Sequence, residues 1–262
     1  MAGDALSYAK GSFRCHVDID EALAFLGHIN QDIDEELLSR LRAMAIRCEE
    51  EHVPRYLWRT FELDSSQGEV SLKRSSLTLP GSSIRSHLDG ATHASLLAVT
   101  IGTTWHRTTA QLNATSATNA LLYDACASAL TESAIEEAHR LLATAARKEG
   151  LEAHARFSPG YGDLPLSIQP SFLREIDAPR KIGVTTTESY FLEPAKSTTA
   201  IVGLFRPGTN NGEGLHLCAV CFAHDYCNFR EHGTTCHGRS GRSGHSGRSA
   251  GTATRQRERE AQ

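Results

Sequence analysis

The segment at residues 115–148 constrains the fold of this 262-residue chain more than any other feature. It is rich in Ala, Leu and Glu, and its apolar residues recur with the spacing of one helix face. Gly150 follows, and glycine is the preferred residue just beyond the end of a helix. The segment therefore predicts the strongest helix of the chain, either continuous or interrupted. Its apolar stripe comprises Leu122, Cys126, Ala129 and Leu130.

A second helix is predicted to begin after Asp34, whose carboxylate can cap the first backbone N–H groups. Apolar residues then fall on one helix face, and Pro54 breaks the helix. Shorter helices are predicted at 81–88 and at 167–176. The apolar face of the second helix comprises Leu37, Leu41, Met44 and Cys48.

Several segments have the composition of β-strands. The run at 95–101 is continuously apolar, which is typical of a buried strand, and Gly102 ends it. Further strands are predicted at 56–63, 70–79 and 153–157. Two adjacent strands are predicted at 183–192 and 197–205. Because strands and helices do not alternate regularly, the sequence predicts an α+β fold, with a mixed or antiparallel twisted sheet and flanking helices.

The run from Arg156 to Asp163 has the composition of a ligand-binding loop. Pro159 fixes one φ angle of a turn, and Gly160 lets a ligand approach the main chain and its bare N–H groups. Arginine can pair with a carboxylate through two parallel hydrogen bonds, so Arg156 would suit an amino-acid-like ligand. A surface ion pair is the usual alternative for any arginine, and Tyr161 could equally be a packed loop aromatic.

Composition limits the partners of this chain. Residues 239–262 hold six Arg and two Glu, a net charge of +4, so the remainder carries −8 of the total of −4. The acidic body argues against nucleic acid as the main partner. The Arg-, Ser- and Gly-rich tail has almost no apolar side chains and is predicted to be disordered. No apolar run approaches the roughly 20 residues that span a bilayer, and no secretory signal is visible, so we expect a cytoplasmic protein without a membrane partner.

Four of the seven cysteines lie in a cluster towards the end of the chain: Cys218, Cys221, Cys227 and Cys236. An odd number of cysteines without a secretory signal indicates reduced thiols or metal ligands and not a disulfide framework. Four thiolates, or three with His237, would complete a zinc site, and an iron–sulfur cluster needs four such ligands as well. The spacing does not distinguish a zinc site from an iron–sulfur cluster, but it favours metal or redox ligation over free thiols without a function.

The loop and the segments after it carry a resemblance to a known family. The pattern Arg-x-x-x-Gly-Tyr at 156–161 is followed by Thr-Glu-Ser at 187–189, and then by Pro194 and a strand of small residues from Ser197. This order and spacing resembles the activation domain of cobalamin-dependent methionine synthase, over about residues 32–204. That family binds S-adenosylmethionine at the Arg-x-x-x-Gly-Tyr loop and uses it to remethylate a cobalamin oxidised out of the catalytic cycle.

The resemblance implies a role for each loop residue. Arg156 would anchor the methionine carboxylate. Backbone groups around Ser158 and Gly160 would hold the polar edges of the ligand, and Tyr161 would contact its adenosyl part. Glu188 has two interpretations of equal weight: a solvent-facing residue of a half-exposed sheet, or an inward carboxylate that holds the Arg156 loop or faces the corrinoid.

The resemblance also implies a stand-alone activation subunit of methionine synthase. It would act on cob(II)alamin held by a separate corrinoid protein, with one electron from a flavodoxin-like donor. The modules for homocysteine, methyltetrahydrofolate and cobalamin are missing, so we expect a methyltransferase component and not the complete enzyme. Three regions are predicted: an activation-domain-like domain at 1–217, a Cys-rich segment at 218–238 and the basic tail at 239–262. The alternative is a cytosolic metal- or redox-sensing module on the same fold that uses the cysteine cluster.

Overall fold

The computed structural model describes residues 6–28, 31–64 and 69–209. Its helices are α1 (Ile19–Phe25), α2 (Glu35–Glu51), α3 (Ser82–His87), α4 (Thr104–Asn113), α5 (Ala117–Lys148), α6 (Gln169–Glu175) and α7 (Ala178–Lys181), with a 3₁₀ turn at Leu166–Ile168. Its strands are β1 (Tyr8–Ser12), β2 (Arg55–Asp64), β3 (Val70–Leu72), β4 (Thr78–Leu79), β5 (His93–Thr100), β6 (Glu152–Phe157), β7 (Thr185–Thr186), β8 (Leu192–Glu193) and β9 (Ser197–Phe205).

Seven strands form one antiparallel sheet in the order β4-β3-β2-β5-β9-β6, and β1 also pairs with β2. The strands β7 and β8 form a separate two-stranded sheet. In the large sheet, β5 and β9 are buried along most of their length. They are covered on both faces, so they lack the alternation of a half-exposed strand. The predicted α+β fold with an antiparallel sheet is confirmed.

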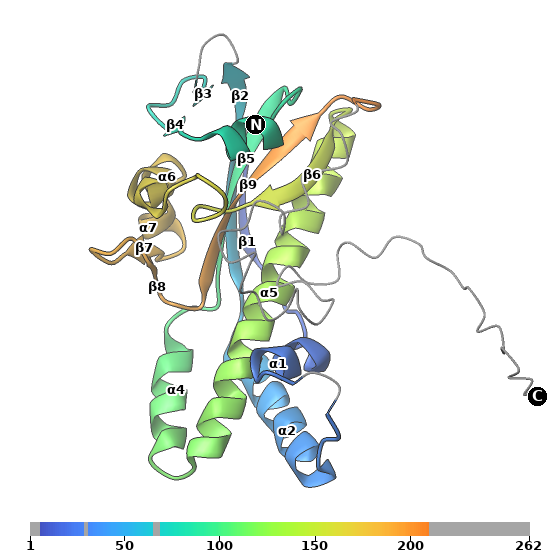
Figure 1. The fold of residues 1–262 in the computed structure, drawn as a ribbon, viewed down its shortest axis with the longest axis vertical. Helices are drawn as coiled ribbons and strands as arrows, with labels where there is room; N and C mark the ends of the chain where they lie inside the picture. Colours follow the sequence, from blue (N-terminus) through green and yellow to red (C-terminus); the bar gives the residue numbers. More distant parts are fainter. Residues whose placement is uncertain (1–5, 29–30, 65–68, 210–262) are drawn as a thin grey trace, which may run out of the picture.

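Helices cover both faces of the sheet (Figure 1). On one face, Leu142 of α5 joins a core with Trp58 and Leu97 of the sheet. On the other face, Ile84 of α3 and Phe172 of α6 pack into a second core. Because these side chains are removed from water on two sides of one sheet, the hydrophobic effect holds three layers together.

Helix α5 extends beyond the sheet, and its first half packs against α1, α2 and α4 (Figure 1). Leu41 of α2 and Tyr123 of α5 meet in this third core. The side chain of Ser116 caps the first turn of α5, and Gly150 follows its end at a φ of 70°. The long helix predicted from the apolar stripe is therefore confirmed, and it is continuous.

One predicted strand is wrong. Residues 183–192 form only the short strand β7 and the start of β8, with a turn between them, and β9 pairs with β5 and β6 instead. Thr187 N donates to Phe191 O at 2.8 Å, and Tyr190 has a φ of 66°. The chain reverses at this point, so a continuous strand cannot form. The strand β1 and the helices α1 and α4 had no counterpart among the predicted elements.

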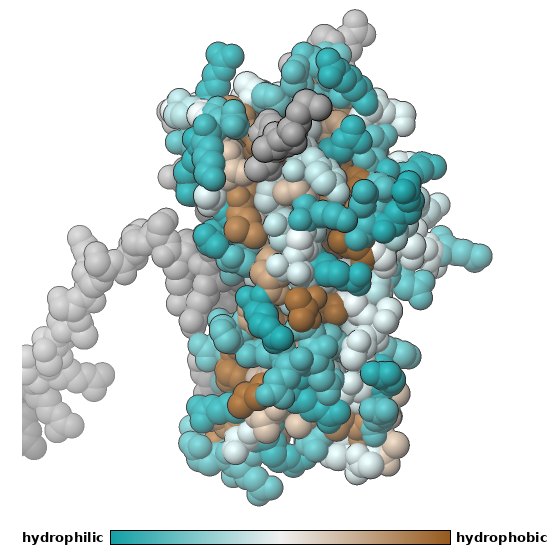
Figure 2. Space-filling view, turned by 180° about the vertical axis from the view of Figure 1, so that it is seen from behind, coloured by the Kyte–Doolittle hydropathy of each residue, from teal (hydrophilic) through white to brown (hydrophobic). Residues whose placement is uncertain are grey.

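The surface seen from behind is mostly polar, with apolar side chains in separate patches (Figure 2). Among the described helices, none combines the length and the apolar character that a bilayer span requires. The longest of them, α5, carries several carboxylates along its length.

Candidate functional site

The predicted ligand loop is closed by its own backbone hydrogen bonds. Gly160 N donates to Leu164 O at 2.8 Å, and Tyr161 N donates to Ser158 O at 3.0 Å. Gly160 has a φ of 96°, and a Cβ atom there would lie 3.1 Å from Leu166, so this turn requires glycine. The N–H groups of Gly160 and Tyr161 are thus occupied within the loop, contrary to the expectation of bare donors.

Asp163 fixes the same loop to α3. Its Oδ1 accepts from Ser83 N at 2.9 Å, and its Oδ2 accepts from Ser82 N at 2.6 Å. These backbone bonds stabilise the charged form and hold the pKa of Asp163 well below its ordinary value. The carboxylate therefore caps a helix, which is a structural role.

A bulge in β6 decides which face of the sheet Arg156 occupies. Ala153 pairs with Leu204 and Arg156 pairs with Val202, so β6 takes three residue steps where β9 takes two. The additional residue shifts the alternation, and Arg156 stands on the face of Val202, which packs in the core shared with α5. Phe157 then points to the opposite face, where it is fully buried in the core of α3 and α6.

Arg156 thereby lies near carboxyl groups on α1 and α5. Glu132 and Glu136 are one turn apart on α5, Glu21 is on α1, and the charge of Arg156 acts on Glu21 and Glu132. Arg156 forms no ion pair with a described carboxylate. Its Nη1 and the Oε1 of Glu136 are buried without a hydrogen-bond partner in the described part of the chain. We call Arg156, Glu21, Glu132 and Glu136 the acidic cluster.

Burial governs protonation in the acidic cluster. It raises the pKa of Glu21 to about 7, with the charges of Glu132 and Glu136 adding to the rise and that of Arg156 opposing it. Burial also raises the pKa of Glu132, again against the charge of Arg156. Nearby, burial and the charge of Arg156 lower the pKa of His139, whose Nε2 donates to a backbone oxygen of β6 at 2.9 Å. The charge of one guanidinium thus acts on two carboxyl groups, with Glu136 beside them; when these carboxyl groups are ionised, the cluster has an excess of negative charge that suits a positively charged ligand.

The other predicted loop residues lie on the far side of the sheet from Arg156. Tyr161 packs edge-on against Phe157, with ring centroids 6.0 Å apart, at the margin of the core of α3 and α6. Ser158 and Gly160 lie in the turn between them. Since β6 is the last strand on its side of the described sheet, one ligand can meet Arg156 and Tyr161 only around this edge. The structure does not bring the two side chains together on one face.

Glu188 lies in the turn between β7 and β8, not within a strand. Its side chain is exposed, which agrees with the solvent-facing interpretation and not with an inward carboxylate that holds the Arg156 loop. A contact between Glu188 and a corrinoid stays a prediction.

Sequence reasoning missed the carboxylates of the acidic cluster. A signal was present, because Glu132, Glu136 and His139 follow each other at intervals of four and three residues, which places them on one helix face. What the spacing could not reveal is that α1 and the bulged strand β6 pack against α5.

The predicted metal ligands lie outside the described residues, so the zinc or iron–sulfur site and the segments 218–238 and 239–262 stay predictions. Within the described ranges, no group of His, Cys, Asp and Glu has the arrangement of a metal site. Three free thiols occur there, and burial raises the pKa of each, which keeps them protonated at neutral pH. The free thiols are Cys15, Cys48 and Cys126, and the predicted ligands are Cys218, Cys221, Cys227 and Cys236.

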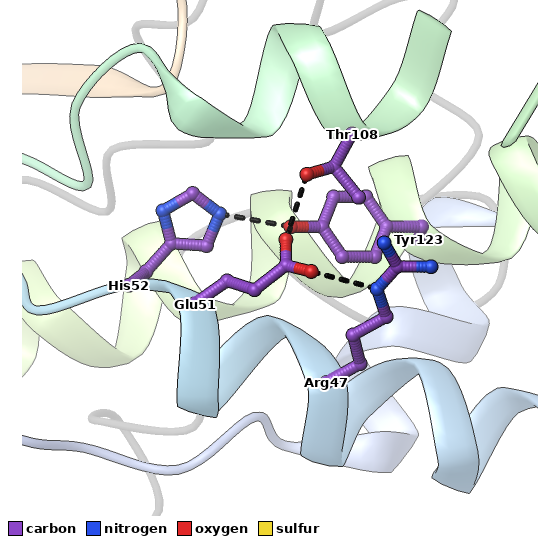
Figure 3. A network of polar contacts seen from close by, with 5 residues as sticks. All are labelled: Arg47, Glu51, His52, Thr108 and Tyr123. Atoms are coloured by element: carbon purple, nitrogen blue, oxygen red, sulfur yellow. Dashed lines mark hydrogen bonds and ion pairs between the residues drawn. The ribbon is translucent and has the colours of Figure 1, made fainter. Parts of the chain in front are cut away.

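A second group of polar side chains joins α2, α4 and α5 (Figure 3). Glu51 Oε2 accepts from Tyr123 Oη and from Thr108 Oγ1, each at 2.7 Å. Glu51 Oε1 accepts from Arg47 Nε at 2.7 Å. Burial alone would raise the pKa of Glu51, but these hydrogen bonds lower it. The ionised carboxylate therefore holds three helices to one another.

His52 completes this network, in which the acceptors outnumber the available hydrogens by one. Its Nδ1 lies 3.1 Å from Ile101 O, which only accepts, so Nδ1 carries the hydrogen. Burial lowers the pKa of His52, and Nε2 is then an acceptor at neutral pH. Tyr123 has one hydroxyl hydrogen for two acceptors, Nε2 at 3.0 Å and the carboxylate of Glu51 at 2.7 Å. The hydroxyl hydrogen goes to the carboxylate of Glu51, because that contact is the shorter one.

Replacing Tyr123 with Phe should destabilise the protein by about 1–3 kcal/mol, because the buried ring remains but a donor to an ionised carboxylate is lost. Urea unfolding at neutral pH measures the change. Thr108→Val removes the other donor to the same oxygen and should have a similar effect. Unfolding midpoints equal to that of the wild type in both variants would show that this network contributes nothing to stability.

Comparison with known proteins extends these findings. No protein-family model matches the sequence, and no curated protein shows significant similarity to it. Among solved structures, the chain is similar to a crystal structure of the MetH reactivation domain bound to AdoHcy. The TM-score is 0.60 at 13% sequence identity, and the alignment covers 87% of this chain and 86% of that chain. At this identity the likeness shows the fold.

Proposed function

We propose that this chain binds S-adenosylmethionine at the acidic cluster and reactivates a corrinoid held by a separate methionine synthase module. The likeness in fold to a reactivation domain solved with AdoHcy supports the class of ligand. The observation that carries the proposal is the buried Nη1 of Arg156, which has no partner among the described residues, on a side chain whose charge acts on Glu21 and Glu132.

The charges of the acidic cluster complement those of S-adenosylmethionine. This ligand has one carboxylate and two positive groups, an ammonium and a sulfonium. Arg156 can pair with the carboxylate through two parallel hydrogen bonds, and the carboxyl groups of α1 and α5 can face the positive groups. A buried polar atom without a partner costs about 1–3 kcal/mol, so Arg156 Nη1 and Glu136 Oε1 favour a ligand that satisfies both.

In this proposal, the residues of the chain bind and orient the ligand. When bound, S-adenosylmethionine supplies a methyl group on a positively charged sulfur. Arg156 holds the methionine end, and the adenosyl part passes around the edge of β6 to Ser158, Gly160 and Tyr161. Orientation towards the partner is the catalytic contribution, since no general acid or base is needed. The partners are a corrinoid-binding module of methionine synthase and a flavodoxin-like electron donor.

Replacing Arg156 with Gln should weaken S-adenosylmethionine binding about tenfold to a hundredfold, because a partly buried hydrogen bond to a charged group is worth about 1.5–3 kcal/mol. Isothermal titration calorimetry measures the affinity. Arg140→Gln removes the same charge from the exposed side of α5, where Arg140 pairs with Glu137, and should bind as the wild type does. Equal affinity in Arg156→Gln and the wild type would exclude Arg156 from the site.

The second stage of the test uses the partner. A corrinoid protein inactivated by oxidation should regain methyl-transfer activity when this chain, S-adenosylmethionine and a reduced flavodoxin-like donor are added together. If the chain binds S-adenosylmethionine but the corrinoid protein does not regain activity, the proposed ligand site stands and the reactivation role is rejected.

A further inference from the structure

A cavity of about 540 Å³ opens on the edge of β2 where its pairing changes from β1 to β3. The strand β1 pairs with β2 up to Arg59, and β3 begins to pair at Leu63, so residues 60–62 lie between the two short strands. Figure 1 shows β1 and β3 at different heights along β2. The volume lies within the range of about 300–1,000 Å³ that is typical of small-molecule sites.

The lining of this cavity carries an excess of positive charge. Arg59, Lys73 and Arg74 contribute three cations, and His93 contributes a fourth when it is protonated. Glu62 is the one carboxylate among the lining residues that the structure describes. With His93 neutral, the lining therefore has a net charge of +2, which suits an anion.

Among the lining residues, Lys73, Arg74 and His93 act on the carboxylate of Glu62. Lys73 Nζ donates to Glu62 Oε2 at 2.9 Å. This bond, followed by the charges of Lys73, His93 and Arg74, lowers the pKa of the Glu62 carboxyl. The Glu62 side chain is exposed, so it can turn away and leave its position to the anionic group of a ligand.

Two arginines beside the cavity have distinctive local structure. The Arg59 guanidinium donates to Glu175 O at 3.1 Å and lies 4.9 Å from the centre of the Phe61 ring. Arg74 has a φ of 62°, an uncommon backbone conformation for a residue with a side chain. Such residues concentrate at ligand sites, where the surrounding structure maintains the strain. The Arg59 side chain thus has its orientation set before any ligand arrives, whereas at Arg74 it is the backbone conformation that is fixed.

We propose that this cavity binds a small organic anion that carries either a phosphate group or paired carboxylates. Arginine suits both groups, because its planar guanidinium matches their oxygen atoms through paired hydrogen bonds. The site is separate from the acidic cluster, since β5 and β9 lie between β2 and β6 in the sheet. It also has the opposite charge, so the two sites select different ligands.

Calorimetric titration of the full chain with inorganic pyrophosphate and, separately, with citrate tests the proposal. We expect one binding site for at least one of these anions. Arg74→Gln should weaken that binding about tenfold to a hundredfold. Arg107→Gln, which removes an exposed arginine from α4, should leave it unchanged. Glu62→Gln should strengthen it several-fold, because the carboxylate that competes for the cations is gone.

The preferred anion distinguishes the two ligand chemistries: tighter pyrophosphate binding indicates a phosphate group, and tighter citrate binding indicates paired carboxylates. Binding of neither anion would overturn the proposal. Equal losses of anion affinity in Arg74→Gln and Arg107→Gln would place the anion elsewhere and overturn the proposal as well. The same conclusion would follow if Glu62→Gln failed to strengthen anion binding. S-adenosylmethionine binding should be unaffected by Arg74→Gln, so the outcome is independent of the proposed function.

Discussion

Between about pH 7 and about pH 4, the free energy of unfolding of the His87→Leu variant should fall by about 3 kcal/mol less than that of the wild type. His87 is only 7% exposed, and its ring centroid lies 5.1 Å from that of Phe157. Burial lowers the pKa of His87 from 6.5 to about 4. The unfolded chain therefore binds a proton here near pH 6.5 and the folded protein only near pH 4, so acid favours unfolding across this range. Leucine binds no proton in either state.

The titration of Glu21 changes the free energy of unfolding in the opposite direction over nearly the same pH range. The pH dependence of the wild-type protein alone would therefore hide the contribution of His87. Its pKa is raised from 4.5 to about 7, which means that the folded protein binds this proton first and acid favours folding. The measurement is therefore a difference between the urea unfolding of wild type and His87→Leu at each pH. His106→Gln changes an exposed histidine on α4 and serves as the control. A difference that stays constant with pH would show that His87 titrates normally.

Replacing Glu132 and Glu136 together with Gln should weaken S-adenosylmethionine binding about a hundredfold. Two charges a few ångströms apart at a partly buried site interact by about 1–4 kcal/mol, so each carboxylate accounts for roughly tenfold. S-adenosylhomocysteine keeps the ammonium but lacks the sulfonium, and its binding should weaken only about tenfold. Calorimetry with both ligands measures the change in preference. Glutamine keeps the side-chain shape and has no charge to bury, so we expect the double variant to fold.

Glu137→Gln is the matched control for these substitutions. It removes a carboxylate from the same helix, but one that pairs with the exposed Arg140, so the affinities for both ligands should not change. In the wild type, S-adenosylmethionine should bind more tightly at about pH 8 than at about pH 6, because Glu21, with a pKa of about 7, becomes charged in this interval. If both ligands lost affinity equally in the double variant, the carboxylates would not recognise the sulfonium.

Local sequence patterns were sufficient for much of the fold. The apolar stripe on 115–148 and the glycine after it correctly predicted α5, and the continuous apolar run at 95–101 correctly predicted the buried strand β5. Asp34 caps α2 as predicted, with its Oδ2 accepting from Leu37 N at 3.2 Å. These features depend on residues a few positions apart, and therefore the sequence displays them directly.

Elements with weak local patterns were missed or misassigned. β1 is an edge strand with mostly exposed side chains, so no apolar alternation marks it. Residues 183–192 contain several threonines, which favour strands, but the turn closed by Thr187 and Phe191 interrupts them. The conformation of β1 is decided by pairing with the distant strand β2, and that of residues 183–192 by a local turn that their threonines do not indicate.

The sequence by itself determined that Arg156 stands beside a Pro-Gly turn, and that Glu132 and Glu136 share one face of a helix. Only the tertiary structure decided that these residues lie together. One additional residue in β6, relative to β9, turns Arg156 towards α5 and leaves Tyr161 on the other side of the sheet. The face of a strand residue follows from its register with the neighbouring strand, and that register is set by the packing of segments far apart in the chain.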